Sequence, residues 1–402
     1  MMICPPDRCT GCSACMNACP LSCIGMAPDA YGEMHPVVEE DKCIRCGKCV
    51  RVCPSNNELD FNAPLACFAV WNTDGEKRRL SASGGVAAAL SEFVTGRSGV
   101  VYGTCLDATL VPRVECAGSP AETEKFKGSK YVQSETGFSL REIGKRLLAG
   151  ESVLFTGTPC QVSGLRSFLG GGHDNLILAD LICHGVCPAG YLKEEIEYLR
   201  HKKGWGGVDA VRFRGNDGNN YKLSLWRGGK CLYVKPAYSQ YYFAGFLKGV
   251  TLRENCYSCR YARPERISDL TLGDFIGLGE KAPFRYDPEN VSSVTVNTEK
   301  GRRFFEEMLE CTPSVMCVRR DYSERLAYAP SLRTPAVRDG LNCRFRTLYL
   351  QEGFVRAIRK TLWASVWRYS VSRFISRKTG YLKRAPGKVA RIVKEKMNKL
   401  WA

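Results

Sequence analysis

The chain lacks the long apolar run that a membrane-spanning helix requires. Although 44% of its 402 residues are hydrophobic, no stretch approaches the roughly 18 uninterrupted apolar residues of a spanning segment. The start of the chain also lacks the cationic region and apolar run of a secretory signal peptide. Histidine is scarce, with four residues in the whole chain. These absences predict a cytoplasmic protein with few side chains that titrate near neutral pH.

Cysteine, by contrast, is abundant, with 22 residues. In a reducing cytoplasm such thiols are expected to be metal ligands rather than disulfides. Eight of them form two copies of one pattern, C-x2-C-x2-C-x3-C-P. The first copy contains Cys9, Cys12, Cys15 and Cys19, and the second contains Cys43, Cys46, Cys49 and Cys53. This pattern is typical of a bacterial-type double 4Fe-4S ferredoxin domain.

In such a domain the fourth cysteine of each copy binds the cluster of the other copy. The spacing therefore predicts one cluster on Cys9, Cys12, Cys15 and Cys53, and a second cluster on Cys43, Cys46, Cys49 and Cys19. Zinc is the alternative, but zinc sites rarely require a third cysteine at this spacing or a trailing proline. Cys4 and Cys23 lie outside both copies and are expected to be packing residues or free thiols.

Strand-like and helix-like runs alternate between about residues 65 and 330. Buried strands are predicted at 100–102, 153–156, 176–182, 270–272 and 294–296, and helices at 86–93, 138–148, 191–199 and 301–309. Residues 208–234 alternate closer to period two, with glycine-rich turns at 215–218 and 228–229, which predicts an antiparallel meander. We expect an α+β or α/β fold with a ferredoxin domain at 1–62, a mixed α/β domain at 65–330 and a basic helical tail at 340–402.

Three segments of the mixed domain contain small residues suited to ligand binding. Ser81 to Gly85 precede an expected helix, whose N-terminus could bind a phosphate. Gly128 to Tyr131 provide a turn, a cation and an aromatic ring. Residues 155–161 form a strand, a tight turn and a helix, with Cys160 at the bend. Turns of this kind also occur without any ligand, so each segment keeps a purely structural interpretation.

A second group of cysteines is spread along the mixed domain. Cys160, Cys183 and the pair Cys256 and Cys259 could converge at strand ends and hold a third 4Fe-4S cluster. Cys187 is a fifth candidate for this site. The alternative is a structural zinc on the Cys256 pair, with the remaining thiols buried and inert.

Five segments of the chain, in this order, are similar to one known family. They are Ser83-Gly84-Gly85-Val86, Gly128 to Tyr131, Gly157 to Val162, Asp180 to Val186, and Cys256-x2-Cys259 followed by Asp269 to Phe275. The chain resembles the coenzyme F-420 hydrogenase/dehydrogenase beta subunit family over about residues 65–330. That family includes the beta subunit of the deazaflavin-reducing hydrogenase, the deazaflavin-oxidising subunit of methanogen electron-transport complexes and 7-hydroxymethyl chlorophyll a reductase.

The resemblance implies an FAD domain with its own 4Fe-4S cluster. That cluster would be held by Cys160, Cys183, Cys256 and Cys259, because relatives commonly have proline where Cys187 stands. The flavin would be lined by Ser83, Gly84, Gly85, Gly128, Ser129, Lys130, Tyr131, Thr156, Gly157 and Thr158. A flavin suits this position, since iron–sulfur clusters move single electrons and hydride donors move two.

These features predict an iron–sulfur flavoprotein oxidoreductase that acts on an organic substrate, with His184 as the best acid–base candidate and Lys130 and Asp274 as weaker ones. Many bacterial relatives are encoded beside genes for surface polysaccharide assembly, which suggests that pathway. The electron donor or acceptor would be a ferredoxin, a reduced deazaflavin or a redox subunit. Two alternatives stay open: an electron-transfer subunit, linked to coenzyme F-420 or ferredoxin, that feeds a separate catalytic partner, and a non-redox assembly or sensor protein.

The net charge of +17 is concentrated in the tail. From residue 333 to the end, 18 lysines and arginines accompany only three acidic residues. Apolar residues recur at helical spacing between 354 and 375, and a second basic amphipathic run follows at 389–401. Such helices lie on an anionic membrane face, dock on an acidic protein, or pack on the main domain. Nucleic acid is not expected as a partner, because no binding motif accompanies the charge.

Overall fold

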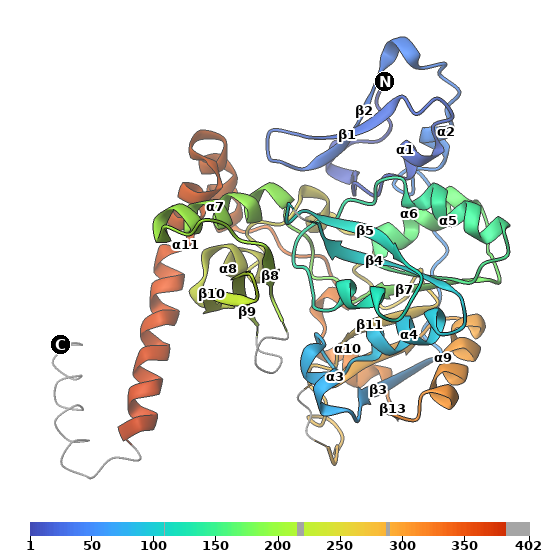
Figure 1. The fold of residues 1–402 in the computed structure, drawn as a ribbon. Helices are drawn as coiled ribbons and strands as arrows, with labels where there is room; N and C mark the ends of the chain where they lie inside the picture. Colours follow the sequence, from blue (N-terminus) through green and yellow to red (C-terminus); the bar gives the residue numbers. More distant parts are fainter. Residues whose placement is uncertain (108, 215–220, 287–289, 383–402) are drawn as a thin grey trace.

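The structure, a computed structural model, consists of a ferredoxin-type domain, a large mixed sheet with helices on both faces, a smaller lobe and a long C-terminal helix (Figure 1). It describes all residues except 108, 215–220, 287–289 and 383–402, and describes no side chains at 376–382. This arrangement confirms the predicted α+β or α/β fold class. No helix in the described part of the chain is long and apolar enough to cross a membrane.

The ferredoxin-type domain shows an internal repeat. Its elements are η1 (Pro6–Arg8), α1 (Ala14–Ala18), β1 (Ile24–Pro28), β2 (Met34–Val38), η2 (Glu40–Lys42) and α2 (Lys48–Arg51), with β1 and β2 paired antiparallel. Left-handed backbone occurs at Gly11 and Ser13 in the first cysteine motif and at the equivalent Arg45 and Gly47 in the second. The chain therefore turns in the same way around both groups of cysteines.

The central sheet has eight strands in the order β13-β3-β12-β11-β7-β6-β4-β5. Their bounds are β3 Ala66–Asn72, β4 Val100–Leu106, β5 Pro112–Ala117, β6 Val153–Gly157, β7 Leu176–Leu181, β11 Leu270–Asp274, β12 Ser292–Val296 and β13 Val315–Arg320. Strands β11, β7, β6 and β4 run parallel, and the strands outside them pair antiparallel. All five strands predicted for this domain are present, and the carboxyl ends of β6 and β7 lead into the predicted site segments.

Helices cover both faces of this sheet. The elements are α3 (Gly75–Leu80), α4 (Val86–Thr95), η3 (Glu122–Phe126), α5 (Ser139–Leu148), α6 (Pro159–Leu169), η5 (Glu254–Ser258), α9 (Glu299–Cys311), α10 (Tyr322–Ala327) and η6 (Pro330–Leu332). Leu90 of α4 and Phe305 of α9 pack with Leu154 on one face. On the other face α5 and α6 pack against Phe155. Successive residues of β6 thus point to opposite cores, as a doubly covered sheet requires.

The smaller lobe carries the predicted antiparallel meander. Its elements are α7 (Ala189–Lys203), β8 (Ala210–Arg212), β9 (Lys222–Arg227), β10 (Lys230–Pro236), η4 (Ala237–Ser239) and α8 (Tyr241–Leu247). The three strands form an antiparallel sheet in the order β10-β9-β8. The predicted turn at 215–218 lies outside the described residues.

The predicted tail begins as part of the folded core. Helix α11 (Gly340–Leu382) bends at Gly353, whose φ of 72° is left-handed. Phe354, Ile358, Leu362 and Val366 are buried against the smaller lobe. Beyond that point α11 extends away from the body of the protein (Figure 1). The second amphipathic run at 389–401 lies outside the described residues.

Arginines of the mixed domain fasten the ferredoxin domain to it. Arg141 of α5 donates to the carbonyl oxygens of Met16, Asn17 and Cys19. Arg253 and Arg260 donate to further ferredoxin-domain carbonyls. Because α5 and α6 lie directly beneath the ferredoxin domain (Figure 1), these contacts hold its cysteines near the edge of the central sheet.

Candidate metal centres and cofactor cavity

The ferredoxin domain contains two small cavities lined by cysteine. Cys9, Cys12, Cys15 and Cys53 line the first, and Cys19, Cys43, Cys46 and Cys49 line the second. Each set combines three cysteines of one motif with the last cysteine of the other, as the spacing predicts. A fifth thiol lines each cavity, Cys4 in the first and Cys23 in the second. Neither position can be deduced from the motif, because both lie outside it.

The scattered cysteines of the mixed domain converge. Cys160 is the second residue of α6, Cys183 follows β7, and Cys256 and Cys259 lie in and just after η5. Burial raises the pKa of Cys160 to about 11 and that of Cys183 to about 12, and neighbouring thiolates of the set add to both increases. Cys256 is buried and the other three thiols are half-buried. Four neighbouring thiols that repel one another as thiolates are suited to a cationic metal centre, which deprotonates its ligands.

Cys187 lies apart from this set. It is fully buried in the core of the smaller lobe, and its Sγ lies 3.0 Å from Thr251 Oγ1. Burial raises the pKa of Cys187 to about 12, without a contribution from the other four cysteines. The structure therefore groups Cys183, rather than Cys187, with the other three.

Helix α6 brings the first ferredoxin cavity next to this third set. A Cβ on Gly164 would lie 2.8 Å from Cys12 Cβ and 2.9 Å from Cys12 Sγ. Gly164 and Cys160 are four residues apart and so share one face of α6, separated by about 6 Å along its axis. Cys12, Cys160, Cys259 and Tyr261 belong to one hydrophobic cluster. The absence of a side chain at Gly164 thus allows the two cysteine sets to approach each other along one face of α6.

A cavity of about 920 Å³ opens beside the third set. Three predicted segments meet there, at Ser83 and Gly85, at Gly128 to Tyr131, and at Thr156 to Thr158, together with Cys183 and His184. Gly84 does not line the cavity. A Cβ added to Gly84 would lie 2.3 Å from the Val70 carbonyl oxygen and 2.7 Å from the Ser292 nitrogen. The lack of a side chain at Gly84 therefore permits close packing of the turn against β3 and β12.

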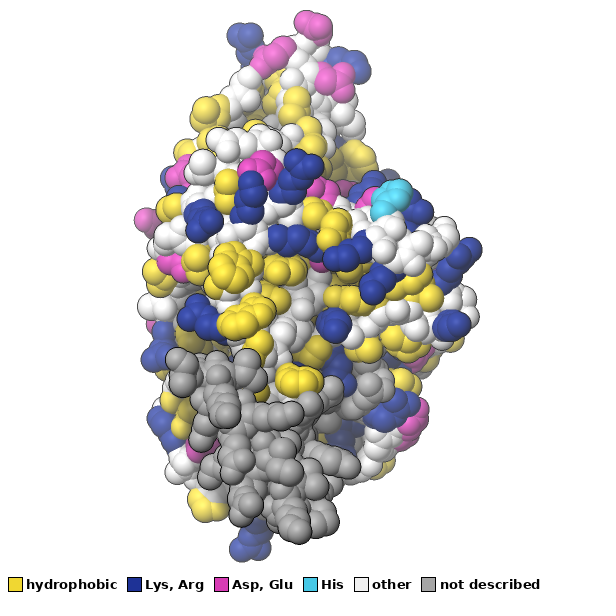
Figure 2. Space-filling view, turned by 90° about the vertical axis from the view of Figure 1, so that its left-hand side faces the viewer, with side chains coloured by type: hydrophobic (Ala, Val, Ile, Leu, Met, Phe, Trp, Pro, Cys, Tyr) yellow, Lys and Arg dark blue, Asp and Glu magenta, His cyan; other side chains and the backbone are white. Residues whose placement is uncertain are grey.

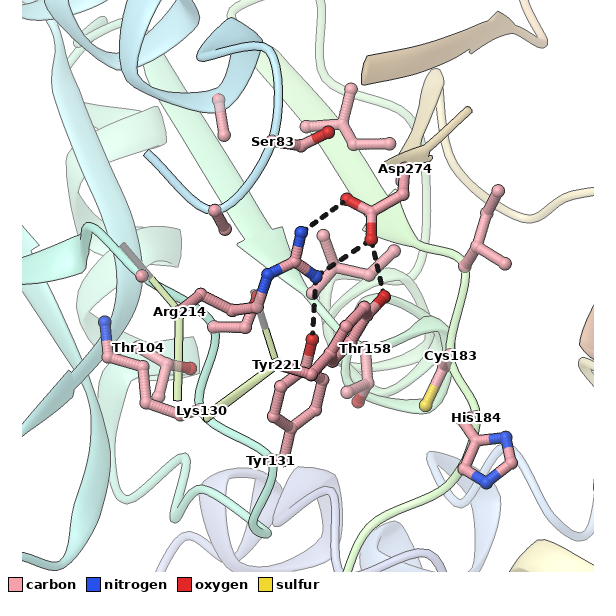
Figure 3. Close-up of a pocket in the computed structure, with 18 of the residues that line it drawn as sticks. Ser83, Thr104, Lys130, Tyr131, Thr158, Cys183, His184, Arg214, Tyr221 and Asp274 are labelled. Atoms are coloured by element: carbon pink, nitrogen blue, oxygen red, sulfur yellow. Dashed lines mark hydrogen bonds and ion pairs between the residues drawn. The ribbon is translucent and has the colours of Figure 1, made fainter. Parts of the chain in front are cut away.

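Asp274 is held in a polar network on the cavity wall (Figure 3). Its Oδ2 lies 2.9 Å from Arg214 Nη1 and accepts a hydrogen bond of 2.8 Å from the Tyr221 hydroxyl. Arg214 also donates to the Tyr131 hydroxyl at 3.1 Å. Burial alone would raise the pKa of Asp274, but Arg214 and its hydrogen bonds hold that pKa below its usual value. Asp274 is therefore an ionised partner of Arg214.

The other two candidate catalytic residues differ in their surroundings. Lys130 Nζ donates to the carbonyl oxygens of Phe126 and Lys127, both at 2.9 Å, and of Lys125 at 3.3 Å. Burial lowers the pKa of Lys130 to about 8. His184 lines the cavity beside Cys183 (Figure 3), with Nε2 3.2 Å from the Phe246 carbonyl oxygen. Lys130 thus fastens a turn, whereas His184 is held at the cavity wall by the backbone of α8 at Phe246 and Leu247.

Sequence reasoning missed several residues of this cavity. Arg214, Tyr221 and Arg325 line it. Arg214 and Tyr221 flank the glycine-rich run at 215–218 in the sequence, whereas Arg325 lies near no segment of small residues. Gln161, the last residue of the predicted 155–161 segment but given no role there, lines it as well and completes the N-terminal capping box of α6 with Thr158. The capping pattern Thr158-x2-Gln161 is the one signal that could have indicated a missed residue from the sequence.

Comparison with known proteins assigns two regions of the chain. Residues 8–57 match the 4Fe-4S dicluster domain, and residues 150–313 match the family described as the C terminus of the coenzyme F420 hydrogenase/dehydrogenase beta subunit. No curated protein matches the chain. Among solved structures, a chain of the xenon-derivatised F420-reducing NiFe hydrogenase complex from Methanosarcina barkeri is similar, with 18% sequence identity and a TM-score of 0.45, over 76% of this chain and 94% of that one.

Proposed function

Because this chain joins a 4Fe-4S dicluster domain to the C-terminal domain of the coenzyme F420 hydrogenase/dehydrogenase beta subunit family, we propose that it is an iron–sulfur flavoprotein oxidoreductase. In this proposal the ferredoxin clusters exchange electrons with a third 4Fe-4S cluster on Cys160, Cys183, Cys256 and Cys259. That cluster exchanges electrons with an FAD in the adjoining cavity. FAD would supply the conversion between one-electron and two-electron transfer.

The observation that carries the proposal is the continuous series of cysteine sets that ends at the cavity. Cys12, from the first ferredoxin set, packs on Gly164 of α6. Cys160, one helical turn away, belongs to the third set, and Cys183 of that set lines the cavity. A protein that used its clusters only for assembly or sensing would not require this continuity.

The cavity fits a dinucleotide cofactor by size and by lining. A volume of about 920 Å³ lies near the upper end of the usual 300–1,000 Å³ range of ligand pockets. The cavity wall includes Ser83 and Gly85 of one turn and Thr156 to Thr158 of another. It also includes Arg325, a buried guanidinium whose Nε and Nη1 find no hydrogen-bond partner among the described residues. A ligand cavity of this kind supports an enzyme with its own substrate over a subunit that only passes electrons on.

Within this proposal His184 is the acid–base candidate, because it lines the cavity beside Cys183. Asp274 and Lys130 instead position other groups of the cavity wall. Asp274 orients Arg214, and Lys130 holds the 125–127 turn. The electron donor or acceptor is a ferredoxin, a deazaflavin or a redox subunit. The role in polysaccharide synthesis and the use of coenzyme F420 remain predictions.

The test is to measure iron, acid-labile sulfide, zinc and released flavin in one anaerobically purified sample. We expect about twelve irons, no stoichiometric zinc and one FAD per chain. About eight irons without flavin would contradict the proposal and favour an assembly or sensing role. About eight irons together with one zinc would restore the structural zinc alternative at the Cys256 pair.

A matched pair of cysteine variants tests the third cluster. Cys183→Ser should lose about four irons per chain, because a thiolate ligand is removed. Cys187→Ser should keep all of its iron, since Cys187 faces Thr251 in the core. If Cys187→Ser loses iron and Cys183→Ser does not, the proposed ligand set is wrong.

We also propose that the outer face of α11 binds an anionic membrane surface. Arg356, Lys360, Trp363 and Trp367 recur at helical spacing and are exposed, with each tryptophan 60% accessible. Figure 2 looks onto this side of the molecule, where apolar side chains lie among lysines and arginines. Tryptophan prefers the lipid headgroup region, and cations are attracted to anionic lipid.

The structure determines how this membrane contact should be tested. A chain truncated near residue 333 would lose Phe354, Ile358 and Leu362 from the core, so its behaviour would be uninterpretable. The double variant W363Q/W367Q keeps the core intact. It should sediment much less with phosphatidylserine vesicles than the unmodified chain, whereas L148Q, at an exposed leucine on α5, should sediment normally. Equal sedimentation of all three proteins would refute the membrane contact.

A further inference from the structure

Arg325 is a buried guanidinium for which the described residues supply no ion-paired carboxylate. It lies in α10, is 2% exposed, and its Nε and Nη1 have no hydrogen-bond partner in the described part of the chain. The other buried arginines are paired: Arg214 with Asp274, Arg266 with Asp180, and Arg253 with backbone carbonyls and Gln133. Arg325 is therefore an exception that requires an explanation.

Deprotonation does not explain how Arg325 can be buried without a partner. Burial lowers the pKa of Arg325, but a guanidinium starts from so high a pKa that it stays protonated in proteins. An unpaired buried cation is strongly unfavourable. A buried cation of this kind is stable where a bound anion neutralises its charge. That anion must enter through the cavity that Arg325 lines.

The surroundings of Arg325 favour an anion with several oxygen atoms. Asp274 is close enough to influence the charge of Arg325, but its carboxylate is already bound by Arg214 and Tyr221. Ser83, whose side chain interacts with Asp274, belongs to the turn that leads into α4. Asp274 therefore compensates the charge of Arg214, and the charge of Arg325 has no carboxylate partner of its own among the described residues.

The N-terminus of α4 adds further donors on the same cavity. The helix runs for ten residues from Val86, and its N-cap, Gly85, has no side chain to cap the first amides. Gly85, Val86, Ala87 and Arg325 all line the cavity. Uncapped helix amides carry a partial positive charge and bind phosphate readily.

We propose that Arg325 and the N-terminus of α4 form a subsite for a phosphate oxyanion of the ligand in this cavity. The inference rests on the proposed function for one source of that phosphate, the diphosphate of FAD. The other source is a phosphate group on the substrate. Both sources present the same chemistry to Arg325, a doubly or singly charged oxyanion that accepts from Nε and Nη1.

The experiment uses the full chain with its clusters in place and its flavin removed. Dissociation constants for FAD and riboflavin are compared between the unmodified protein, R325M, R325K and R319M. Arg319 is an exposed arginine on β13, so R319M is the matched control. The thermal midpoint is also measured for each protein with and without sodium pyrophosphate, before and after FAD is added.

If the phosphate belongs to the cofactor, R325M should bind FAD about 10- to 100-fold more weakly, as expected for loss of a charged hydrogen bond. Riboflavin, which has no phosphate, should bind as before, and R325K should recover part of the loss. The flavin-free R325M protein should unfold at a temperature no lower than the unmodified protein, because methionine removes an uncompensated charge. R319M should change none of these values.

The remaining outcomes separate the two sources and the two proposals. If R325M leaves FAD binding unchanged but abolishes stabilisation of the FAD-bound protein by pyrophosphate, the subsite serves a substrate phosphate. If the unmodified protein binds no flavin yet pyrophosphate stabilises it through Arg325, the flavoprotein proposal fails and the subsite stands. The subsite is refuted if R325M alters neither response, or if FAD and riboflavin binding fall together with the thermal midpoint.

Discussion

Replacing Arg253 by methionine should release the ferredoxin domain from the mixed domain. Arg253 is completely buried. Its guanidinium donates to the Cys9 carbonyl oxygen at 3.1 Å and to the Met34 carbonyl oxygen at 3.2 Å, both in the ferredoxin domain. On the other side it donates to Gln133 Oε1 at 2.6 Å and to Asn255 Oδ1 at 3.1 Å. One side chain therefore joins a cluster-binding segment to the mixed domain.

The magnitude follows from these contacts. Each charge-assisted hydrogen bond contributes about 1.5–3 kcal/mol. Methionine would leave two ferredoxin-domain carbonyls and the Gln133 oxygen buried without this partner, although a shifted chain or water can restore some bonds. We therefore expect R253M to weaken docking by about 3–5 kcal/mol, the usual cost of removing one side of a buried charged contact. Arg260 also bonds to the ferredoxin domain but is exposed, so R260M should cost at most about 1 kcal/mol.

Hydrogen exchange measures this effect locally, which matters because a protein with several domains and cofactors has no single free energy of unfolding. Amides of residues 9–15 and 34–38 should exchange roughly 10²- to 5 × 10³-fold faster in R253M, since 1.36 kcal/mol corresponds to a factor of ten. R260M should stay within about tenfold of the unmodified protein. If R253M also stays within that limit, or R260M exceeds R253M, the buried guanidinium does not control docking.

Two further predictions concern α6 and the cavity turn. G164A should be less stable than G144A by about 1–3 kcal/mol in thermal or denaturant unfolding. Both substitutions increase helix propensity, but only a Cβ at position 164 would lie 2.8 Å from Cys12. Equal stability of the two variants would show that the contact with Cys12 adjusts freely. K130M should lower the thermal midpoint and weaken flavin binding, because Lys130 Nζ fastens three carbonyl groups. The exposed Lys145 provides the control, and a K130M protein that behaves like K145M would contradict this role.

The parts of the fold that could be predicted are those determined by local patterns. The cysteine motifs have fixed spacing because a cubane cluster fixes the positions of its ligands, and the buried strands show as short apolar runs. The edge strands β5 and β13 were missed because their exposed positions carry charged residues, such as Arg113 and Arg319. The inner strand β3 was missed as well, although most of its residues are buried. A half-exposed edge strand is hard to distinguish from a loop by composition alone.

The candidate site was predictable only where a motif marks it. The segments around Ser83, Lys130 and Thr158 contain glycine and proline in recognisable turns. Arg214 and Arg325 reach the same cavity from the smaller lobe and from α10, and no local pattern distinguishes them from surface arginines. Their importance appears only when burial and hydrogen-bond partners are known, since those depend on tertiary contacts.

The turn from β6 into α6 brings the cavity wall, the third cysteine set and the ferredoxin contact together in one short segment. Thr158 caps α6 and lines the cavity, Cys160 belongs to the third cysteine set, and Gly164 contacts Cys12 of the ferredoxin domain. These three positions span less than two turns of helix, about 9 Å along the axis. A helix this short does not bend appreciably, so their separations are fixed once α6 forms. Any displacement of α6 must therefore change the ferredoxin contact, the third cysteine set and the cavity wall together.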